Sequence, residues 1–380
     1  MTKVIIPYET SLGERRVSAT PETVKKLNSL GCDVYIEKSA GELSGFNDFS
    51  YQENGGNVFE KGNQDVWKDA DIVFCVQCPE EKNIRNLKPG SFLAGMLNPY
   101  NNSVLRKLLL ETKVSAISLE LIPRISRAQS CDALSSQANI AGYKSVLLAA
   151  NELDRYFPML MTAAGTVQPA KVVVLGGGVA GLQAVATAKR LGAQVFVSDI
   201  RPAVKEQVES LGAKFIDLPE IDEKPKESGG YAKEVSSKFL DEQRSILTKH
   251  LSEADVAICT AQVLGKKAPV LINEEMLDRM RIGSVVIDLA VAQGGNCQNT
   301  VENKTIIRNG VKLIGASELP SSVPYHASSL YSKNLVSLLT PFIKDGNIQI
   351  NKDDEIILGC LLSDNGAILQ EKVFAMGGTN

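Results

Sequence analysis

The segment from Lys171 to Arg201, KVVVLGGGVAGLQAVATAKRLGAQVFVSDIR, constrains the fold more than any other part of the chain. An apolar run leads into glycines at G-x-G-x-x-G spacing, small residues follow, and a second apolar run ends at Asp199. This order predicts a strand, a tight turn, a helix and a second strand, the unit with which many proteins bind a dinucleotide. We therefore predict a dinucleotide site at the turn, in preference to a glycine-rich turn without a ligand.

Each glycine of this turn has a separate physical reason. Gly176 permits the tight turn after the strand, Gly178 lets the backbone approach a pyrophosphate, and Gly181 lets the helix pack closely on the sheet. The helix that starts near Val179 offers its first N–H groups and a partial positive charge to phosphate groups. The additional glycine, Gly177, is expected to loosen the turn slightly without preventing binding.

The acidic residue at the end of the second strand bears on which dinucleotide binds. A carboxylate at Asp199 accepts hydrogen bonds from the ribose hydroxyls and repels a 2′-phosphate, which favours NAD over NADP. Arg201 lies two residues later and could accommodate a 2′-phosphate, so NADP stays open on these residues alone.

Elsewhere, predicted strands alternate with predicted helices, which is typical of α/β proteins with parallel sheets. We expect two Rossmann-like domains, with a nucleotide domain (residues 138–327) inserted into a discontinuous first domain (residues 1–137 and 328–380). A long helix over residues 139–156 would join them, and the crevice between them would hold the active site. The stretch 218–234 is rich in Pro, Gly and charge, and we expect an exposed mobile segment there.

The expected elements follow from apolar runs and their boundary residues. In the first domain, strands are expected over residues 3–7, 33–37, 71–77, 91–97 and 114–121, with helices from Pro21 to just before Gly31 and over 104–112. After the fingerprint, strands are expected over 255–260, 284–289 and 311–314. The tail starts with a helix near Ala327, continues with two short strand-like runs, and is expected to return to the first domain.

Composition excludes several classes of protein. The 380 residues are 44% hydrophobic and 22% charged with a net charge of −3, as in ordinary globular proteins. No basic cluster with interleaved aromatic residues is present, so we expect no nucleic-acid partner. No apolar run has the length of a membrane span, and the N-terminus is expected to form a strand and not a signal peptide.

Cysteine and histidine usage favours reduced thiols and no metal. The seven cysteines are scattered, as expected for thiols in a cytosolic compartment. Cys75 and Cys78 form a C-x-x-C inside the apolar run IVFCVQC, where core packing is favoured over a metal or redox role. His250 and His326 lack a metal-ligand pattern around them.

A second polar segment, PRISRAQSCDALSSQANIAG at residues 123–142, lies between an apolar strand and the joining helix. Arg124, Gln129, Asp132 and Ser135 together supply hydrogen-bond donors and acceptors, which a nicotinamide carboxamide needs to fix its ring face. A helix-capping loop, with Ser130 or Asp132 as the cap, explains the same residues equally well.

Several segments together resemble the NAD(H)-binding component of proton-translocating NAD(P) transhydrogenase. They are PRISRAQSCDALSSQANIAGY, TAAGTVQPAKVVVLGGGVAGLQAVATAKRLGA, RPAVKEQVESLGAKF, GGYAKE, IDLAVAQGGNC and KNLVSLLTPF, and the similarity runs from Arg15 to the tail. The resemblance implies that the loop residues orient the nicotinamide ring: Arg124, Gln129, Asp132 and Ser135. It implies cofactor-binding roles for Gly176, Gly178, Val179, Gly181, Asp199, Ile200, Gln262 and Tyr231, with Tyr231 on a mobile loop that closes over bound nucleotide.

The related alanine dehydrogenases differ at the substrate site. They carry a substrate-binding Lys and a catalytic His where this chain has Gln77 and Asn98. Neither amide anchors a carboxylate by charge or acts as an acid or base near neutral pH. Oxidation of an amino acid requires removal of a proton, whereas hydride transfer between two nicotinamides does not, so the substitutions favour transhydrogenation.

We therefore expect this chain to bind NAD(H) and to exchange hydride with NADP(H) on a partner component. The resemblance implies a membrane component that couples the exchange to proton movement, a homodimer, and a cytoplasmic location at the membrane face through partner subunits. The chain would be a peripheral subunit or the soluble part of a longer one. An amino-acid dehydrogenase of the alanine dehydrogenase type and a non-catalytic NADH-binding module stay open as alternatives.

Overall fold

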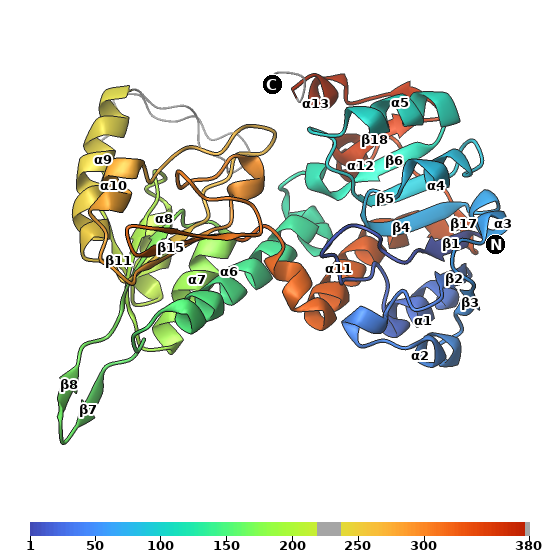
Figure 1. Ribbon diagram of the computed structural model, residues 1–380. Coiled ribbons are helices and arrows are strands. Elements are labelled where there is room, and N and C mark those ends of the chain that lie inside the picture. The colour runs from blue at the N-terminus through green and yellow to red at the C-terminus, as the bar shows by residue number, and fades with distance from the viewer. Residues whose placement is uncertain (219–236, 377–380) are drawn as a thin grey trace. The chain divides into compact units, whose positions relative to one another are not determined.

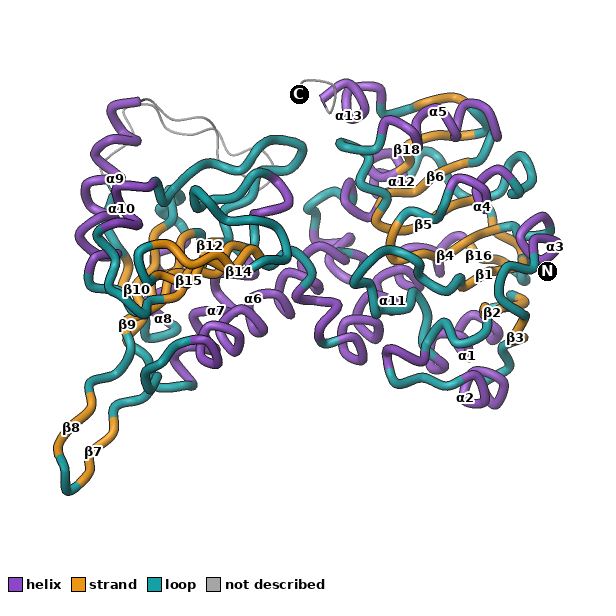
Figure 2. Tube along the Cα trace, viewed as in Figure 1, coloured by secondary structure: helices purple, strands orange, loops and turns teal. Residues whose placement is uncertain are grey.

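The computed structural model describes residues 1–218 and 237–376, without the side chains of residues 237–241 and 375–376. The chain divides into two compact units, residues 1–137 with 321–380 and residues 138–320. Strands and helices alternate along both units (Figure 2). Each unit is described by itself below.

The first unit is built on an eight-stranded sheet in the order β19-β18-β6-β5-β4-β1-β2-β3 (Figure 1). The first six strands in the chain run parallel, and β18 and β19 add an antiparallel edge. Their order places the reversal of chain direction across the sheet between β1 and β4, as in doubly wound folds. The strands are β1 Lys3–Ile6, β2 Asp33–Glu37, β3 Asn57–Phe59, β4 Ile72–Gln77, β5 Phe92–Met96, β6 Ser115–Ser118, β18 Leu361–Asp364 and β19 Ala367–Ile368.

Helices cover both faces of this sheet because alternate strand residues point to opposite sides. On one face, Val4 and Ile6 join a core with α1 (Pro21–Ser29), α2 (Asp48–Glu53), α11 (Pro324–Leu339) and α12 (Glu355–Cys360). On the other face, Ile5 and Val73 join a core with α3 (Gln64–Lys68), α4 (Glu81–Arg85) and α5 (Ser103–Thr112). A short helix α13 (Glu371–Met376) and a hairpin of β16 (Ile343–Lys344) and β17 (Asn347–Ile348) complete the unit.

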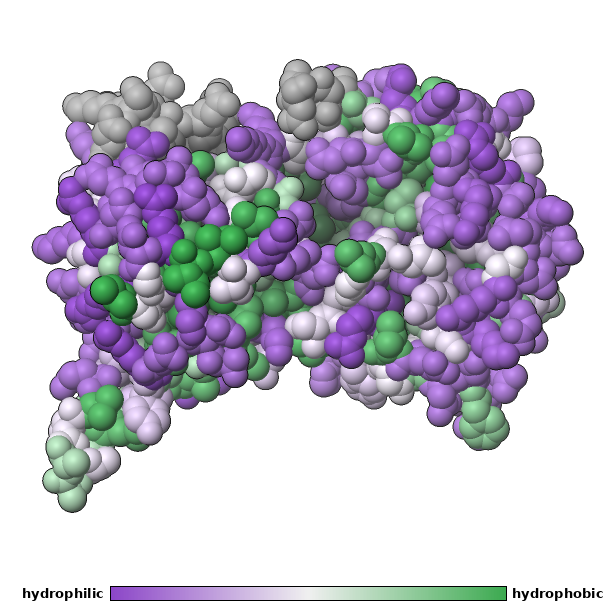
Figure 3. All heavy atoms as spheres, in the orientation of Figure 1, coloured by the Kyte–Doolittle hydropathy of each residue, from purple (hydrophilic) through white to green (hydrophobic). Residues whose placement is uncertain are grey.

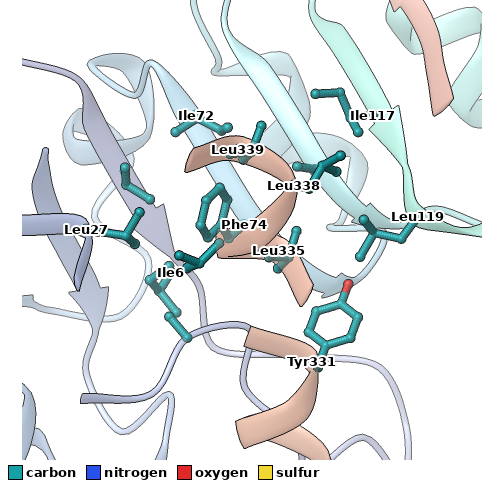
Figure 4. Packing of buried hydrophobic residues seen from close by; sticks show 14 of the residues in the cluster. Ile6, Leu27, Ile72, Phe74, Ile117, Leu119, Tyr331, Leu335, Leu338 and Leu339 are labelled. Atoms are coloured by element: carbon teal, nitrogen blue, oxygen red, sulfur yellow. The ribbon is translucent and has the colours of Figure 1, made fainter. Parts of the chain in front are cut away.

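The C-terminal helix α11 belongs to the first core. Its residues Tyr331, Leu335 and Leu339 are fully buried and lie against Ile6 and Phe74 of the sheet (Figure 4). The Tyr331 hydroxyl donates to the carbonyl of Cys75 at 2.7 Å. The chain therefore leaves the first unit, builds the second and returns, which confirms the expected α/β fold with a discontinuous first domain.

The return to the first unit begins at Ser321, earlier than the expected boundary at residue 328. Residue 328 lies inside α11, whose first turn already belongs to the first unit. Ser321 is tied there because its hydroxyl accepts a hydrogen bond from the backbone N–H of Arg15 at 2.7 Å and donates to Glu14 at 2.8 Å. Such contacts join residues about 300 positions apart and leave no local signal in the sequence.

The second unit is built on a seven-stranded sheet in the order β11-β10-β9-β12-β13-β15-β14. Six strands are parallel, again with the reversal after the first strand, between β9 and β12, and β14 is an antiparallel edge strand. The strands are β9 Lys171–Leu175, β10 Gln194–Ser198, β11 Lys214–Phe215, β12 Val256–Cys259, β13 Val285–Asp288, β14 Thr305–Arg308 and β15 Val311–Gly315.

Helices again cover both faces of the sheet. Val172 and Val174 pack with α6 (Ala133–Glu152) and α7 (Val179–Arg190), whereas Val173 and Leu175 pack with α9 (Ser237–Ser252) and α10 (Glu274–Asp278). A further helix, α8 (Val204–Ser210), follows β10. The sequence analysis did not predict the hairpin of β7 (Leu160–Thr162) and β8 (Gly165–Val167), whose residues are mostly exposed.

Two expected elements have different bounds in the structure. The joining helix α6 starts at Ala133 instead of residue 139, because Asp132 caps it. The strand expected over residues 114–121 ends at Ser118 and continues as a 3-10 turn over Leu119–Leu121.

Candidate nucleotide site

The turn after β9 requires glycine at Gly176 for reasons internal to the fold. Its φ is +104°, in the left-handed region that favours glycine. A Cβ there would lie 2.6 Å from the Thr260 hydroxyl, which donates to the Gly176 carbonyl at 2.8 Å. Thr260 follows β12, so this hydrogen bond ties the two strands at which the sheet order reverses.

Gly181 is also required by packing. A Cβ on it would lie 1.9 Å from the Gly176 carbonyl oxygen, a distance that no real structure tolerates. The first turn of α7 therefore sits directly on the strand end, as predicted for a helix that packs closely on the sheet.

Gly178 differs from both of these glycines. Its φ is −76°, which any residue adopts, and a Cβ on it would meet no heavy atom within 4 Å. Neither the backbone nor the packing requires glycine, so the space beside Gly178 is open. Gly178 is also the N-cap of α7, whose first internal hydrogen bond runs from Leu182 N to Gly178 O at 2.8 Å. The N–H groups of the first turn, beginning with exposed Val179, therefore precede any internal acceptor.

The Asp199 carboxylate lies beside this turn and is held by several donors. The Gly177 N–H donates to it at 2.7 Å, so Gly177 helps to hold the turn, and the expectation that it loosens the turn was wrong. Arg201 donates to Asp199 from its backbone N–H at 2.8 Å and from its guanidinium at 2.8 and 2.9 Å. Ile200 lies between them and is partly exposed.

Gln262 and two residues that the sequence analysis missed shape the loop after β12. Gln262 is exposed, and its amide donates to the Leu289 carbonyl at 2.8 Å. The buried Asn296 side chain accepts from Ala261 N at 3.0 Å and donates to Ala261 O and Pro269 O at 2.8 Å each. Thr260 and Asn296 follow strands at the reversal point, and that position is the signal that could have found them.

The second polar segment forms the 3-10 helix η3 (Ser126–Cys131) and the start of α6, in the first unit. The structure brings Asp132 and Ser135 together, because the Asp132 carboxylate accepts from Ser135 N at 2.9 Å and from Ser135 Oγ at 2.6 Å. Asp132 is thus the N-cap of α6, one of the two caps considered from the sequence. Arg124 and Gln129 are exposed, and the Gln129 carbonyl accepts from Asp132 N at 3.3 Å.

The C-terminal segment anchors this loop. The Asn334 amide of α11 donates to the Ser130 carbonyl at 2.8 Å and accepts from the Ser136 hydroxyl at 2.7 Å. Arg127 forks onto Asp354, the N-cap of α12, at 2.7 and 3.0 Å. The backbone beside Gln129 is therefore held from two helices of the return segment.

The two positions that separate this chain from alanine dehydrogenases carry amide side chains in structural contacts. Gln77 ends β4, and its amide donates to Glu14 at 3.1 Å. Asn98 is exposed with φ +48°, and its N–H donates to Glu120 at 2.7 Å. Cys75, also on β4, is buried in the core around α3, α4 and α5.

Tyr231 and most of the stretch 218–234 lie outside the described residues. Within the described part of the chain, no helix is long and apolar enough to cross a membrane, and no group of His, Cys, Asp and Glu side chains could hold a metal ion.

Two doubly wound sheets, one with a dinucleotide-type turn at its reversal point, define a protein of the nucleotide-dependent oxidoreductase class. The chain matches the alanine dehydrogenase/PNT N-terminal domain over residues 5–141 and the alanine dehydrogenase/PNT C-terminal domain over residues 145–371. It is 45% identical to an NAD(P) transhydrogenase subunit alpha chain of Rhodospirillum rubrum over 383 residues, 99% of this chain and 100% of the relative. The chain belongs to the alanine dehydrogenase/PNT family, and within it to the alpha subunits of NAD(P) transhydrogenase.

The solved structures and more distant relatives agree with this assignment. The structure of transhydrogenase from Sinorhizobium meliloti matches with a TM-score of 0.87 at 40% identity, over 96% of this chain and 99% of that one. Alanine dehydrogenase of Staphylococcus saprophyticus is 27% identical over 376 residues, 97% of this chain and 95% of its own.

Proposed function

We propose that this chain binds NAD(H) at the fingerprint turn and exchanges hydride with NADP(H) held on a partner component. The observation that carries the binding site is Gly178. The fold gives no reason for glycine at that position, whereas a pyrophosphate approaching the N-terminus of α7 does. Gly176 and Gly181, by contrast, shape the turn itself.

NAD(H) is the dinucleotide that Asp199 supports. Its carboxylate is fixed beside the turn by Gly177 and Arg201, where a ribose hydroxyl could share it and a 2′-phosphate would be repelled. The guanidinium of Arg201 is committed to Asp199 by two hydrogen bonds, and this pairing disfavours its use as a 2′-phosphate ligand. Ile200 and Gln262 would line the adenosine and central parts of the bound nucleotide.

The loop residues would orient the nicotinamide ring. Gln129 offers both an amide donor and an acceptor to the ring carboxamide, Arg124 adds a cation, and the Asp132–Ser135 pair keeps the loop in place. Bound NAD(H) supplies the hydride acceptor or donor carbon. The chain contributes orientation and no acid or base, and proximity of two oriented rings would supply most of the rate. Gln77 and Asn98 fit this reaction because no proton has to be removed.

The partners would be an NADP(H)-binding component and a transmembrane component that couples the exchange to proton movement. We also propose a homodimer. Its support is the β7–β8 hairpin, which extends from the second unit and carries Met159, Met161 and Val167 with 56%, 77% and 40% exposure (Figures 1 and 3). Exposed apolar side chains on a narrow ribbon are typical of a surface that another chain covers.

Reconstitution with a partner component tests the proposed reaction. Mixed with an NADP(H)-binding component, the protein should transfer hydride from NADPH to an NAD analogue with a shifted absorbance. Alone, it should bind NADH, which fluorescence titration measures, and catalyse little. Robust alanine-dependent reduction of NAD by the isolated protein would contradict the proposal.

A further inference from the structure

A buried ion pair lies in the first unit, whereas the fingerprint turn belongs to the second. The guanidinium of Arg16 forks onto the carboxylate of Glu14, with Nε–Oε1 at 2.8 Å and a terminal nitrogen–Oε2 at 2.6 Å. The two side chains are only 5% and 3% exposed. The side-chain carbonyl oxygen of Gln137 accepts a further hydrogen bond from Arg16 at 2.9 Å. The guanidinium is therefore fixed independently of Glu14.

The Glu14 carboxylate receives far more than this one partner. Oε1 accepts from the N–H groups of Arg15 and Arg16 at 3.1 and 2.9 Å and from the Ser321 hydroxyl at 2.8 Å, and Oε2 accepts from the Gln77 amide at 3.1 Å. With the two guanidinium contacts, six donor contacts converge on one carboxylate. They come from three segments that are distant in the sequence.

The position of this cluster is where doubly wound sheets bind ligands. Gln77 is the last residue of β4, and the segment with Glu14 and Arg16 follows β1, so the donors gather at the carboxyl ends of the two strands where the sheet order reverses. Burial alone would raise the pKa of Glu14, but the hydrogen bonds and charge of Arg16 outweigh it and lower that pKa to about 2. The occupant is thus a carboxylate at every physiological pH.

We propose that this cluster is a binding site for a small monocarboxylate that the chain fills with its own Glu14. An ordinary ion pair needs one counter-charge, whereas here a guanidinium, a hydroxyl, an amide and two backbone N–H groups are aimed at both oxygens. Because Gln137 holds Arg16 and the remaining donors are fixed by strand or backbone, the donors stay in place without Glu14. The inference does not depend on nucleotide binding.

Truncation of Glu14 defines the size of the ligand. Glu14→Ala removes a CH2–COO group, which has the heavy atoms of acetate, and Glu14→Gly removes one carbon more, as in propionate. We expect Glu14→Ala to lower the melting temperature by several degrees, since it leaves a buried guanidinium without its counter-charge. Acetate and formate should restore it in a saturable manner, and propionate should do so only in Glu14→Gly.

The controls separate a carboxylate site from a salt effect. Chloride and acetamide, matched in concentration, should not restore Glu14→Ala, and acetate should not stabilise the wild-type protein, whose site is full. Glu14→Gln fills the same volume without charge and should stay unresponsive to acetate. Equal restoration by chloride, or no response to any carboxylate, would overturn the proposal. If Glu14→Ala folds poorly, its refolding yield in acetate and in chloride is compared, and equal yields overturn it as well.

Discussion

At the scale of the residue, the fingerprint glycines separate what folding requires from what a ligand requires. Gly181 faces a backbone carbonyl 1.9 Å from where its Cβ would lie, and Gly178 faces open space. The same one-letter motif therefore contains one residue placed by packing and one left open for a phosphate. This difference can be tested because the two positions are three residues apart in one turn.

Gly178→Ala should leave the melting temperature within about 1–2 °C of the wild type, since a surface change without contacts alters stability by roughly 0.5 kcal/mol or less. It should weaken NADH binding about tenfold or more, equivalent to ~1.4 kcal/mol, because the methyl group occupies the phosphate position. Gly181→Ala is the matched control and should lower stability by about 1–3 kcal/mol through its backbone clash. Thermal unfolding and NADH titration of both variants decide; parallel losses in both variants would speak against a reserved phosphate site.

Gln129→Asn shortens the amide side chain by one methylene without removing its donor and acceptor. We expect hydride transfer to slow by about 10- to 100-fold, because a misplacement of about 1 Å has effects of that order, while NADH affinity changes much less. Single-turnover transfer and NADH titration measure the two effects. Ser126→Ala, exposed in the same loop, serves as the control, and equal losses in rate and affinity for Gln129→Asn would indicate a simple binding role.

Glu9 gives a pH dependence that can be measured near neutrality. It lies after β1 and accepts from the N–H groups of Val76 and Gln77 at 2.5 and 3.1 Å, and burial raises its pKa to about 8. The folded state then holds the proton more tightly than the unfolded chain, where the pKa is about 4.3. The stability contribution is complete below about pH 4.3, falls as the pH rises towards 8, and is constant above that.

Urea unfolding of the wild type and Glu9→Gln between pH 6 and 9 should show this trend. The stability of the wild type relative to Glu9→Gln should decrease with rising pH and level off above about 8. A difference that stays constant over this range would show that the pKa of Glu9 is not raised in the folded protein.

At the scale of the element, the start of α6 shows how one side chain sets both a helix boundary and a site. Asp132 caps the helix through Ser135, so the helix begins at Ala133 and the loop before it turns sharply. Cap and nicotinamide-orienting residue were alternatives in the sequence, but the geometry allows both roles for one carboxylate. Substitutions that keep the cap and change the charge separate them.

Asp132→Ala should lower the unfolding free energy by about 1 kcal/mol through loss of the cap, and Asp132→Asn should retain most of the stability because asparagine caps well. If the carboxylate also orients the ring, Asp132→Asn should still slow hydride transfer several-fold. Chemical unfolding and stopped-flow transfer rates of the two variants provide the test. A transfer rate that follows stability alone would leave Asp132 with the capping role only.

The local part of this architecture could be predicted from the sequence, and the long-range part could not. The fingerprint turn, α7 and Asp199 lie within 30 residues, so spacing and strand–helix order were sufficient. The anchors of the loop, such as Asn334 on Ser130, span 204 residues and depend on where a returning helix packs. Thr260 and Asn296 were missed for the same reason, since only the sheet order brings them to the turn.

At the scale of the whole molecule, the exposed hairpin is the feature that an assembly would explain. Met161 lies on one face of the ribbon opposite Thr166, and both are exposed. We expect Met161→Asp to shift the protein from dimer towards monomer, since a charge replaces apolar contact area. Thr162→Asp, on the other face of the ribbon, is the matched control. Light scattering over a range of concentrations measures the mass, and an unchanged dimer would exclude Met161 from the interface.

The insertion of one unit into the other also has a consequence for biosynthesis. The core of the first unit includes Tyr331 and Leu335 of α11, which are translated long after residues 1–137. The second unit ends at residue 320, so its chain emerges from the ribosome complete while the first sheet still lacks a covering helix. Residues 1–137 therefore wait with an uncovered apolar face, and the unit that begins first is the one that finishes last.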